Sequence, residues 1–277
     1  MIEKPDVFLK NLEKELPLYI KHDFIANSQT QYLSFIKEKL KQGEFLVTLD
    51  FAENYSFKIQ DAIQSYHWSN DQATLHPYVI YYKHETKVVN ESFVIISENN
   101  KHDAMAVHMF NKKMIHHLQL IYGSENVKKI FFFSDGCAAQ YKNKLNFINL
   151  LHYKTDFNVD TEWHFFATSH GKGACDGIGG TVKRLASRTS LQRPHGKQIT
   201  TPYELYQWAA QYFDNIVFEF STQKEYDIES KQLRKRFKNA KPIKGTRAYH
   251  AFIPVDCKRI TCKNFSSSIN FDVHKIT

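Results

Sequence analysis

The order of strand-like and helix-like segments constrains the fold of this chain more than any single motif does. Three strand-like segments come first, at 44–52, 73–83 and 91–99. Helices and strands then alternate, as helix 103–123, strand 127–135, helix 138–155, strand 161–169 and helix 180–191. Sequential strands usually form an antiparallel meander, whereas strands separated by helices usually join a sheet in parallel. The order predicts an α/β protein with a mixed five-stranded sheet and helices on both faces.

Further segments flank this core. Residues 5–42 carry apolar residues at helical spacing, and Pro17 is expected to interrupt the helix. Thr201 followed by Pro202 predicts the start of another helix. The tail is basic at 231–247 and strand-like after it. We expect three parts, namely a helical N-terminal segment (1–43), a catalytic core (44–220) and a basic C-terminal extension (221–277).

Composition narrows the class of protein. With 42% hydrophobic and 14% aromatic residues the chain is a folded globular protein. Because no apolar run approaches the roughly 20 residues that span a bilayer, and no signal peptide is evident, we expect no membrane partner. We place the chain in the nucleus, or in nucleus and cytoplasm. Four cysteines in a reducing compartment predict neither a disulfide framework nor structural zinc.

The net charge of +8 and the isoelectric point near 9.1 favour a polyanionic partner such as nucleic acid, although a lysine excess also serves solubility. The glycine-rich stretch 164–184 is no phosphate-binding nucleotide loop, since it contains neither GxxxxGK[ST] nor GxGxxG. A kinase or nucleotide hydrolase is therefore disfavoured.

Three aspartates stand at related places in the predicted sheet. Asp50 lies in the first strand, Asp135 ends the fourth, and Asp176 follows the fifth near the start of a helix. If the first and fourth strands are neighbours, these carboxylates meet at one edge. Clustered carboxylates repel unless cations neutralise them, and oxygen ligands suit Mg²⁺ or Mn²⁺. Two such ions about 4 Å apart serve phosphodiester chemistry.

Each acid also has a structural interpretation. Asp135 could cap the following helix and Asp176 could form a turn with Gly177. Asp50 is harder to explain in that way, because an acid inside an apolar strand is costly without a partner. The metal-site hypothesis depends on the three acids together.

Three blocks carry a family resemblance, namely 50–68 (DFAENYSFKIQDAIQSYHW), 132–147 (FFSDGCAAQYKNKLNF) and 163–184 (WHFFATSHGKGACDGIGGTVKR). They resemble blocks of transposon-derived eukaryotic proteins, whose core is similar to the DDE-type transposases and integrases of the ribonuclease-H-like superfamily. The order of elements matches the topology of that fold. The resemblance implies a catalytic, metal-binding triad of Asp50, Asp135 and Asp176 with two Mg²⁺ or Mn²⁺ ions, with Asp in the third place where many such enzymes have Glu.

Basic residues and one histidine surround these acids. His170 is a candidate general acid or base, metal ligand or orienting donor, or a structural residue. The candidate nucleic-acid contacts are Lys142, Lys144, Lys172, Lys183, Arg184 and Arg188. For the residues after Asp135, a solvated helix face is the alternative. Glu53 is expected to be structural, and His67 and Trp68 are more typical of core packing than of base stacking.

The sequence thus predicts metal-dependent DNA strand transfer or cleavage by a transposase-like core. The alternative is a domesticated, catalytically inactive nucleic-acid-binding protein, favoured because no zinc-binding or helix-turn-helix pattern precedes Asp50. A third hypothesis, a nuclease acting on RNA–DNA hybrids, shares the acids but not the family blocks. DNA is the expected partner, and homo-oligomerisation is left open.

Overall fold

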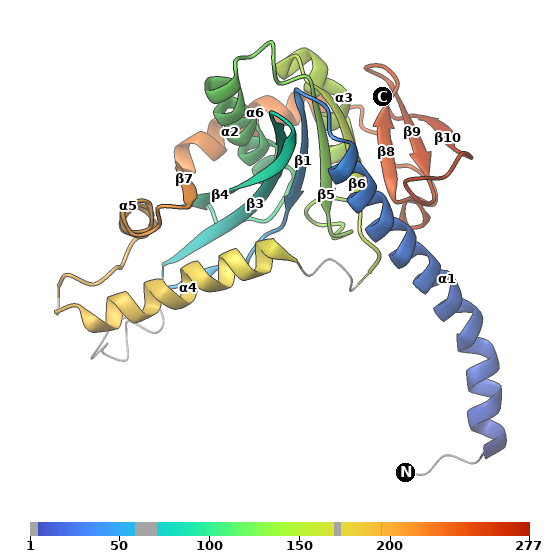
Figure 1. Cartoon of the computed structure of the whole chain (residues 1–277), viewed down its shortest axis with the longest axis horizontal. Coiled ribbons are helices and arrows are strands. Elements are labelled where there is room, and N and C mark those ends of the chain that lie inside the picture. Colours follow the sequence, from blue (N-terminus) through green and yellow to red (C-terminus); the bar gives the residue numbers. More distant parts are fainter. Residues whose placement is uncertain (1–4, 59–70, 169–172, 195) are drawn as a thin grey trace.

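The computed structural model describes residues 5–58, 71–168, 173–194 and 196–277. They form an α/β protein in which helices cover both faces of one mixed sheet (Figure 1). The described α-helices are α1 (Pro5–Lys39), α2 (Ala104–Tyr122), α3 (Lys144–Phe157), α4 (Ala174–Gln192), α5 (Pro202–Tyr212) and α6 (Gln223–Phe237). A short 3-10 helix, η2, spans Thr246–Ala248.

The described strands are β1 (Glu44–Leu49), β2 (Tyr55–Ser56), β3 (Gln72–His84), β4 (Lys87–Ser97), β5 (Lys129–Ser134), β6 (Asp160–Phe165), β7 (Ile216–Ser221), β8 (Ala251–Pro254), β9 (Arg259–Lys263) and β10 (Asp272–Lys275). Their order is β10-β9-β8-β6-β5-β1-β3-β4-β7, with β2 paired to β3 off this path. β1 pairs antiparallel with β3 and parallel with β5, and β5 pairs parallel with β6. The predicted mixed α/β architecture is confirmed.

The predicted strand number is wrong, because the described residues contain ten strands in this sheet. β7 pairs parallel with β4, and β8 pairs antiparallel with β6. The five predicted strands alone would leave two edges with unpaired backbone N–H and C=O groups, and the added strands cover them. Residues from 221 onward therefore belong to the same folded body, since β8 to β10 continue the sheet beyond β6 and α6 contacts α2.

Alternating side chains divide the core between the two faces of the sheet. On one face α2, α3 and α6 pack over a large cluster that includes Val47 and Phe132. On the opposite face α4 and α5 cover a cluster that includes Leu75, while α1 covers Leu46 and Phe131. Figure 1 shows α4 running under the sheet and α1 crossing it on the side of β5 and β6.

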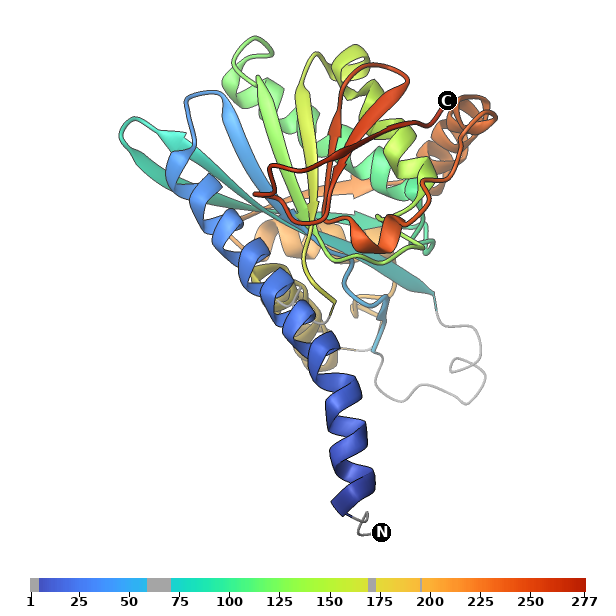
Figure 2. The ribbon, with the colours of Figure 1, turned by 90° about the vertical axis from the view of Figure 1, so that its right-hand side faces the viewer.

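α1 is one continuous helix, so the predicted interruption at Pro17 is wrong. Residues 5–20 are exposed, so the carbonyl groups that lose a donor to the proline face solvent. Figure 2 shows this part of the helix projecting away from the body. The other half is fixed by Gln29, whose amide donates to the Phe165 carbonyl and the Ser266 hydroxyl, both at 2.8 Å.

Several predicted helix ends are confirmed, and two starts are different. Asp103 caps α2 through its carboxylate, and Thr201 caps α5 in a capping box with Glu204. α3 begins only at Lys144, because the Asn143 side chain accepts hydrogen bonds from the backbone N–H groups of the first turn. α4 begins already at Ala174 despite its glycines, since tertiary packing outweighs local propensity.

None of the described helices combines the length and apolarity needed to cross a membrane.

Candidate functional site

Asp50 and Asp135 follow directly the carboxyl ends of two neighbouring parallel strands. The paired register between β1 and β5 ends with Thr48 opposite Phe133, and continuing it brings Asp50 opposite Asp135. The backbone N–H of Asp50 donates to the Pro77 carbonyl at 3.3 Å, which ties this end of β1 to β3. Both aspartates are only partly exposed. The central strands of the sheet therefore set the first two acids side by side.

α4 brings the third acid to this edge. Cys175 is buried, and its Sγ lies 3.4 Å from the Thr48 carbonyl oxygen of β1. A Cβ on Gly179 would meet the Ala52 Cβ at 2.9 Å, so glycine permits the close approach of α4 to the chain after β1. Asp176 lies in the first turn of the helix, next to Cys175, and is exposed. The packing of α4 thus places a carboxylate near the ends of β1 and β5.

The three carboxylates influence one another electrostatically. The pKa of Asp50 rises to about 7, first because burial removes water from the carboxylate and then because of the charges of Asp135 and Asp176. The pKa of Asp135 is also raised, by burial and by the charge of Asp176, although a hydrogen bond from the Cys137 backbone opposes this. The three acids, from separate parts of the chain, therefore lie close enough to interact, with Asp50 and Asp135 partly buried and Asp176 exposed.

Local hydrogen bonds hold two of these carboxylates. Asp135 Oδ1 accepts from the Cys137 N–H at 3.1 Å, and Asp176 Oδ2 accepts from the Gly173 N–H at 3.1 Å. Both structural interpretations from the sequence are wrong in detail. Asp135 does not cap α3, because Asn143 is the N-cap of that helix, and Asp176 forms no turn with Gly177, because both residues lie inside α4. Each of these two bonds engages one oxygen of a carboxylate.

The three carboxylates suit divalent cations by their chemistry, although they are not grouped tightly enough to surround an ion. Within the described residues no group of three or more His, Cys, Asp or Glu side chains closes tightly enough to hold a metal ion by itself. An all-carboxylate set at a partly solvated edge suits Mg²⁺ or Mn²⁺, which keep several waters and complete their shell with substrate oxygens. The residue types and their charge repulsion fit such ions, for which Asp50, Asp135 and Asp176 would be the protein ligands.

A cluster of packed aromatic and histidine side chains lies next to the acids, and the sequence alone does not indicate it. The Tyr141 hydroxyl lies 2.9 Å from His76 Nε2, and both side chains are fully buried. Phe51 stacks on His102 and meets His76 edge-on. Tyr141 stands in one of the family blocks, among the residues after Asp135 for which the sequence suggests a phosphate contact or a solvated helix face. Its burial makes it a support of the site.

The predicted basic residues divide into several groups. Lys142 is buried, whereas Lys144 is exposed at the start of α3. Lys183 donates to the Glu53 carbonyl at 3.2 Å, so this contact fastens α4 to the chain after β1. Arg184 and Arg188 form an exposed row one helical turn apart. Glu53 lies in the segment between β1 and β2, outside both strands.

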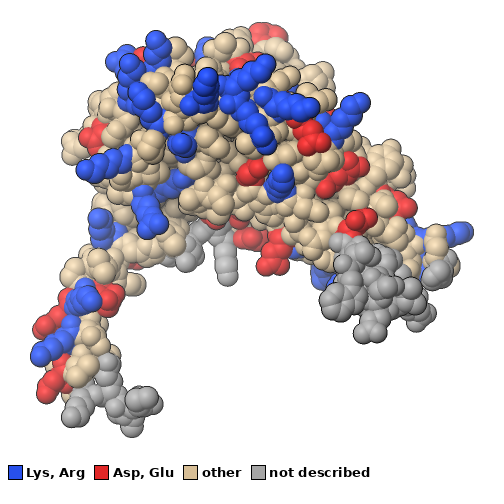
Figure 3. Space-filling view, turned by 180° about the vertical axis from the view of Figure 1, so that it is seen from behind, with Lys and Arg blue, Asp and Glu red and all other residues tan. Residues whose placement is uncertain are grey.

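Some predicted positions fall outside the described residues. These are His170, Lys172, His67 and Trp68. On the described surface, Figure 3 shows Lys and Arg side chains gathered over the upper part of one face, while the projecting part of α1 carries charges of both signs. The charge of this protein is therefore unevenly distributed.

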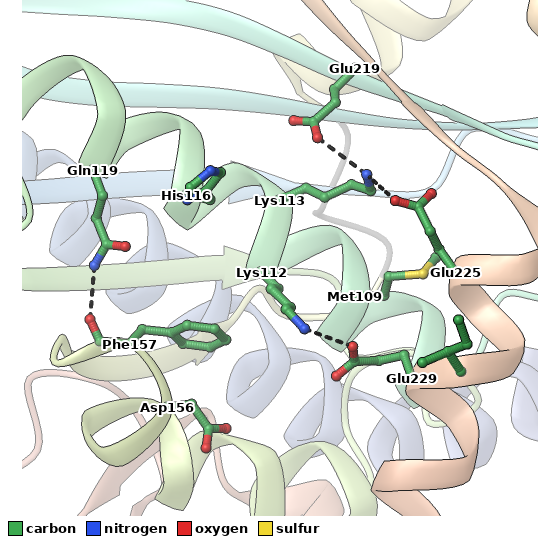
Figure 4. A pocket seen from close by; sticks show the side chains of 11 residues that line it. Met109, Lys112, Lys113, His116, Gln119, Asp156, Phe157, Glu219, Glu225 and Glu229 are labelled. Carbon is green, nitrogen blue, oxygen red and sulfur yellow. Dashed lines mark hydrogen bonds and ion pairs between the residues drawn. The ribbon is translucent and has the colours of Figure 1, made fainter.

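A pocket of about 590 Å³ lies away from the acids, between α2, α6 and β7 (Figure 4). Lys113 pairs there with Glu219 at 3.2 Å and with Glu225 at 2.8 Å. Lys112 pairs with Glu229 at 2.9 Å. We call this the paired pocket, because its lysines already have carboxylate partners.

With this geometry the chain can be compared with known proteins. It belongs to the family described as "Domain of unknown function (DUF8701)", whose model matches residues 29–266. The match includes all three acids, the strands β1 and β5 that precede two of them and the helix α4 that carries the third. No curated protein and no solved structure matches the chain.

Proposed function

We propose that this chain is a metal-dependent enzyme that transfers or cleaves DNA strands, with a ribonuclease-H-like, DDD-type core similar to DDE transposases. The observation that carries the proposal is geometric: Asp50 and Asp135 follow two neighbouring parallel strands, and α4 packs against β1 so that its first turn brings Asp176 to the same edge. A partly buried acid whose pKa is raised to about 7, first by burial and then by neighbouring carboxylates, costs folding free energy, and such groups cluster at functional sites.

The strand order supports the fold assigned in this proposal. In the central part of the sheet, β6-β5-β1-β3-β4, the first strand is central. It has the antiparallel meander on one side and the parallel strands on the other. This order, with an acid after the first and the fourth core strand and a third acid on the following helix, resembles that of ribonuclease-H-like nucleases and transposases. The resemblance of the three sequence blocks points in the same direction.

In the proposed mechanism, Asp50, Asp135 and Asp176 would hold two Mg²⁺ or Mn²⁺ ions. When bound, such ions activate a water or a 3′-hydroxyl and stabilise the leaving oxygen of a phosphodiester. The sheet fixes Asp50 and Asp135, so that little reorganisation is needed at these two positions.

The start of α4 leaves room for a nucleic-acid backbone beside these acids. A Cβ added to Gly177 or Gly180 would meet nothing within 4 Å among the described atoms. Asp176, Gly180, Arg184 and Arg188 follow one another at intervals of four residues and therefore lie on one exposed face of the helix. On this face the two arginines are suited to bind strand phosphates.

The alternative, a DNA-binding protein without catalysis, is favoured by a different observation. Asp135 and Asp176 already accept local backbone hydrogen bonds, and the described residues hold no closed metal-ligand group. In that case the acids would be remnants of a lost catalytic site, and the arginines of α4 would bind DNA without any metal ion.

A nicking and strand-joining assay separates these functions. Purified protein is incubated with supercoiled DNA, and with duplexes that offer a free 3′-hydroxyl, in Mg²⁺, Mn²⁺ or EDTA. The enzyme is expected to nick or join DNA only with a divalent ion, and Asp135→Asn is expected to lose about a thousandfold or more of the activity.

Asp160→Asn is the matched control, because Asp160 is an exposed aspartate whose partner is Lys154 on the surface. It is expected to keep wild-type activity. Activity that survives Asp135→Asn would exclude the mechanism. DNA binding without any divalent-ion-dependent cleavage would instead establish the alternative.

A further inference from the structure

A second hollow, of about 540 Å³, begins one residue after Asp135. Gly136 lines it, together with Lys142 and Lys144 from the chain that enters α3. Arg247 and His250, from the segment that leads into β8, close it on the other side. We call this hollow the basic pocket. Among the described residues that line it, none is Asp or Glu.

Lys142 is the most informative residue of the basic pocket. Its side chain is buried, with 9% exposure, and its Nζ donates to the Arg247 carbonyl at 3.3 Å. Within the described residues no carboxylate lies within ion-pair distance of it. Burial lowers its pKa to about 8. Its Nζ also lies 5.3 Å from the centre of the Phe165 ring. A buried ammonium group whose partners are a carbonyl and an aromatic ring, with no carboxylate, is costly, and an anion that entered the pocket would reduce this cost.

The other cations share this lack of acidic partners. Arg247 and Lys144 are exposed, and among the described residues neither forms an ion pair. His250 uses Nδ1 against the Asn264 carbonyl at 2.8 Å, so its other ring nitrogen is not engaged by this bond. Burial and the charge of Lys142 lower the pKa of His250. A bound anion would oppose this lowering.

The shape of the pocket indicates more than a small inorganic ion. Phe166, Pro242 and Ile243 add apolar lining beside the cations. A neighbouring hollow of about 650 Å³ shares Arg247 and His250 with the basic pocket and extends toward α1. Cations next to apolar surface suit a nucleotide unit, with its phosphate on the cations and its sugar and base on the apolar side.

We infer that the basic pocket binds one phosphate group of the DNA strand whose neighbouring phosphate lies at Asp50, Asp135 and Asp176. This inference rests on the proposed function, from which it takes DNA as the bound ligand. It adds that the C-terminal segment, through Arg247 and His250, forms part of the substrate site. The strand would then pass from the acids, over Gly136, into the basic pocket.

The test is a binding assay that needs no cleavage. A labelled single-stranded oligonucleotide is titrated with protein in EDTA at several salt concentrations, for wild type, Arg247→Gln and Lys142→Gln. Each variant is expected to bind about tenfold more weakly, because it can no longer form a charge-assisted hydrogen bond to the phosphate. The slope of log affinity against log salt should decrease by about 0.7 for each phosphate that the variant no longer neutralises.

Lys112→Gln removes the same charge from the paired pocket and serves as the control, with an expected change of less than about twofold. Arg247 is exposed, so its variant should fold even if Lys142→Gln does not. Equal affinities for wild type and a folded Arg247→Gln would overturn the inference, as would an equal loss in all three variants.

A further arm separates this inference from the proposed function. If the pocket variants lose DNA affinity while wild type cleaves nothing in the nicking assay, the phosphate site stands and only the catalytic proposal fails. If wild type binds no DNA, but inorganic phosphate raises its melting temperature and not that of Arg247→Gln, the pocket takes a free phosphate compound. That result would overturn the assignment to a DNA strand.

Discussion

Two hollows of similar volume differ in how their charges are balanced. In the paired pocket, Lys113 lies between Glu219 and Glu225, at 3.2 and 2.8 Å. In the basic pocket, the buried Lys142 donates to a backbone carbonyl, and Arg247 adds a second cation without a described carboxylate partner. The acids beside the basic pocket show the opposite imbalance, because there carboxylates gather without a described cation.

This difference separates structural from functional charge. Charges that are balanced within the protein contribute to its own stability, and the paired pocket needs no ligand to explain its residues. Charges left unbalanced in partly buried positions cost folding free energy, so a ligand of opposite charge is the simplest reason for their presence. By this criterion the acids favour a divalent cation and the basic pocket favours a phosphate.

The largest expected effect of a single substitution on stability is in the paired pocket. Lys113→Met would leave Glu219 and Glu225 facing each other without their shared cation. Burial alone would lower the pKa of Lys113, but the hydrogen bonds and charges of the two glutamates raise it. We expect a loss of about 2 kcal/mol, less than for a fully buried pair because the glutamates are partly exposed. Urea unfolding measures it, and an unchanged midpoint would contradict the assignment of a structural role.

The pH dependence of stability tests the charge balance beside the paired pocket, where His108 is buried next to Glu229. Burial, and then the charges of Arg236 and Lys112, lower its pKa to about 3, so His108 is neutral at pH 7. Its 3.6 Å contact with Glu229 is therefore not an ion pair. Since the unfolded chain takes up this proton near pH 6.5 and the folded chain does not, stability should fall as the pH drops below 6.5.

We expect His108 to contribute about 2 kcal/mol to this fall between pH 6.5 and 5. His76 and His164 are also buried with lowered pKa values and act in the same direction. Urea unfolding of wild type and His108→Gln across this range measures the contribution. The variant should show the shallower dependence, and parallel curves would mean that His108 is protonated in the folded state.

The smallest of these effects is expected in the basic pocket, and its sign is the opposite of that for Lys113. Lys142→Met removes a buried charge that has no described carboxylate partner and keeps most of the side-chain volume. The metal-free and DNA-free protein should become more stable by about 1 kcal/mol. Thermal unfolding at pH 7 tests this. A loss comparable to that of Lys113→Met would show that Lys142 has a structural partner and is not held ready for a ligand.

Much of the sheet could be predicted from the sequence, because strand and helix patterns differ in period and their order limits the topology. The pattern does not predict β7 or the strands after β8. They are short, and their burial depends on the edges that they cover. It also predicts too late a start for α4, because Gly177, Gly179 and Gly180 disfavour a helix locally. The observed start at Ala174 is explained only by the packing of the helix against β1 and the chain that follows it.

The candidate site was predictable only in part. Acids that end strands can be found from the pattern, and Asp50 and Asp135 do lie at neighbouring strand ends. The contribution of Arg247 and His250 could not be found, because these residues approach the site only through the pairing of β8 with β6. Nor could the burial of Lys142 and Tyr141 be foreseen, since both follow Asp135 in a segment whose polar residues resemble a solvated surface.

The central claim is that Asp50, Asp135 and Asp176 form a divalent-cation site. It is tested most directly by the melting temperature of wild type and Asp50→Asn, at pH 8, with increasing Mn²⁺. Because the pKa of Asp50 is raised to about 7, its contribution to stability is present at low pH and lost as the pH rises through 7. Without metal, Asp50→Asn should therefore be more stable than wild type, by about 1–2 kcal/mol after allowance for solvent screening.

With Mn²⁺ at about 100 times its dissociation constant, wild type should gain about 2.7 kcal/mol, seen as a rise of several degrees in melting temperature. Asp50→Asn should show little or no rise, and Asp160→Asn should respond as wild type does. No rise in wild type, or an equal rise in Asp50→Asn, would contradict the claim that these three acids bind the cation.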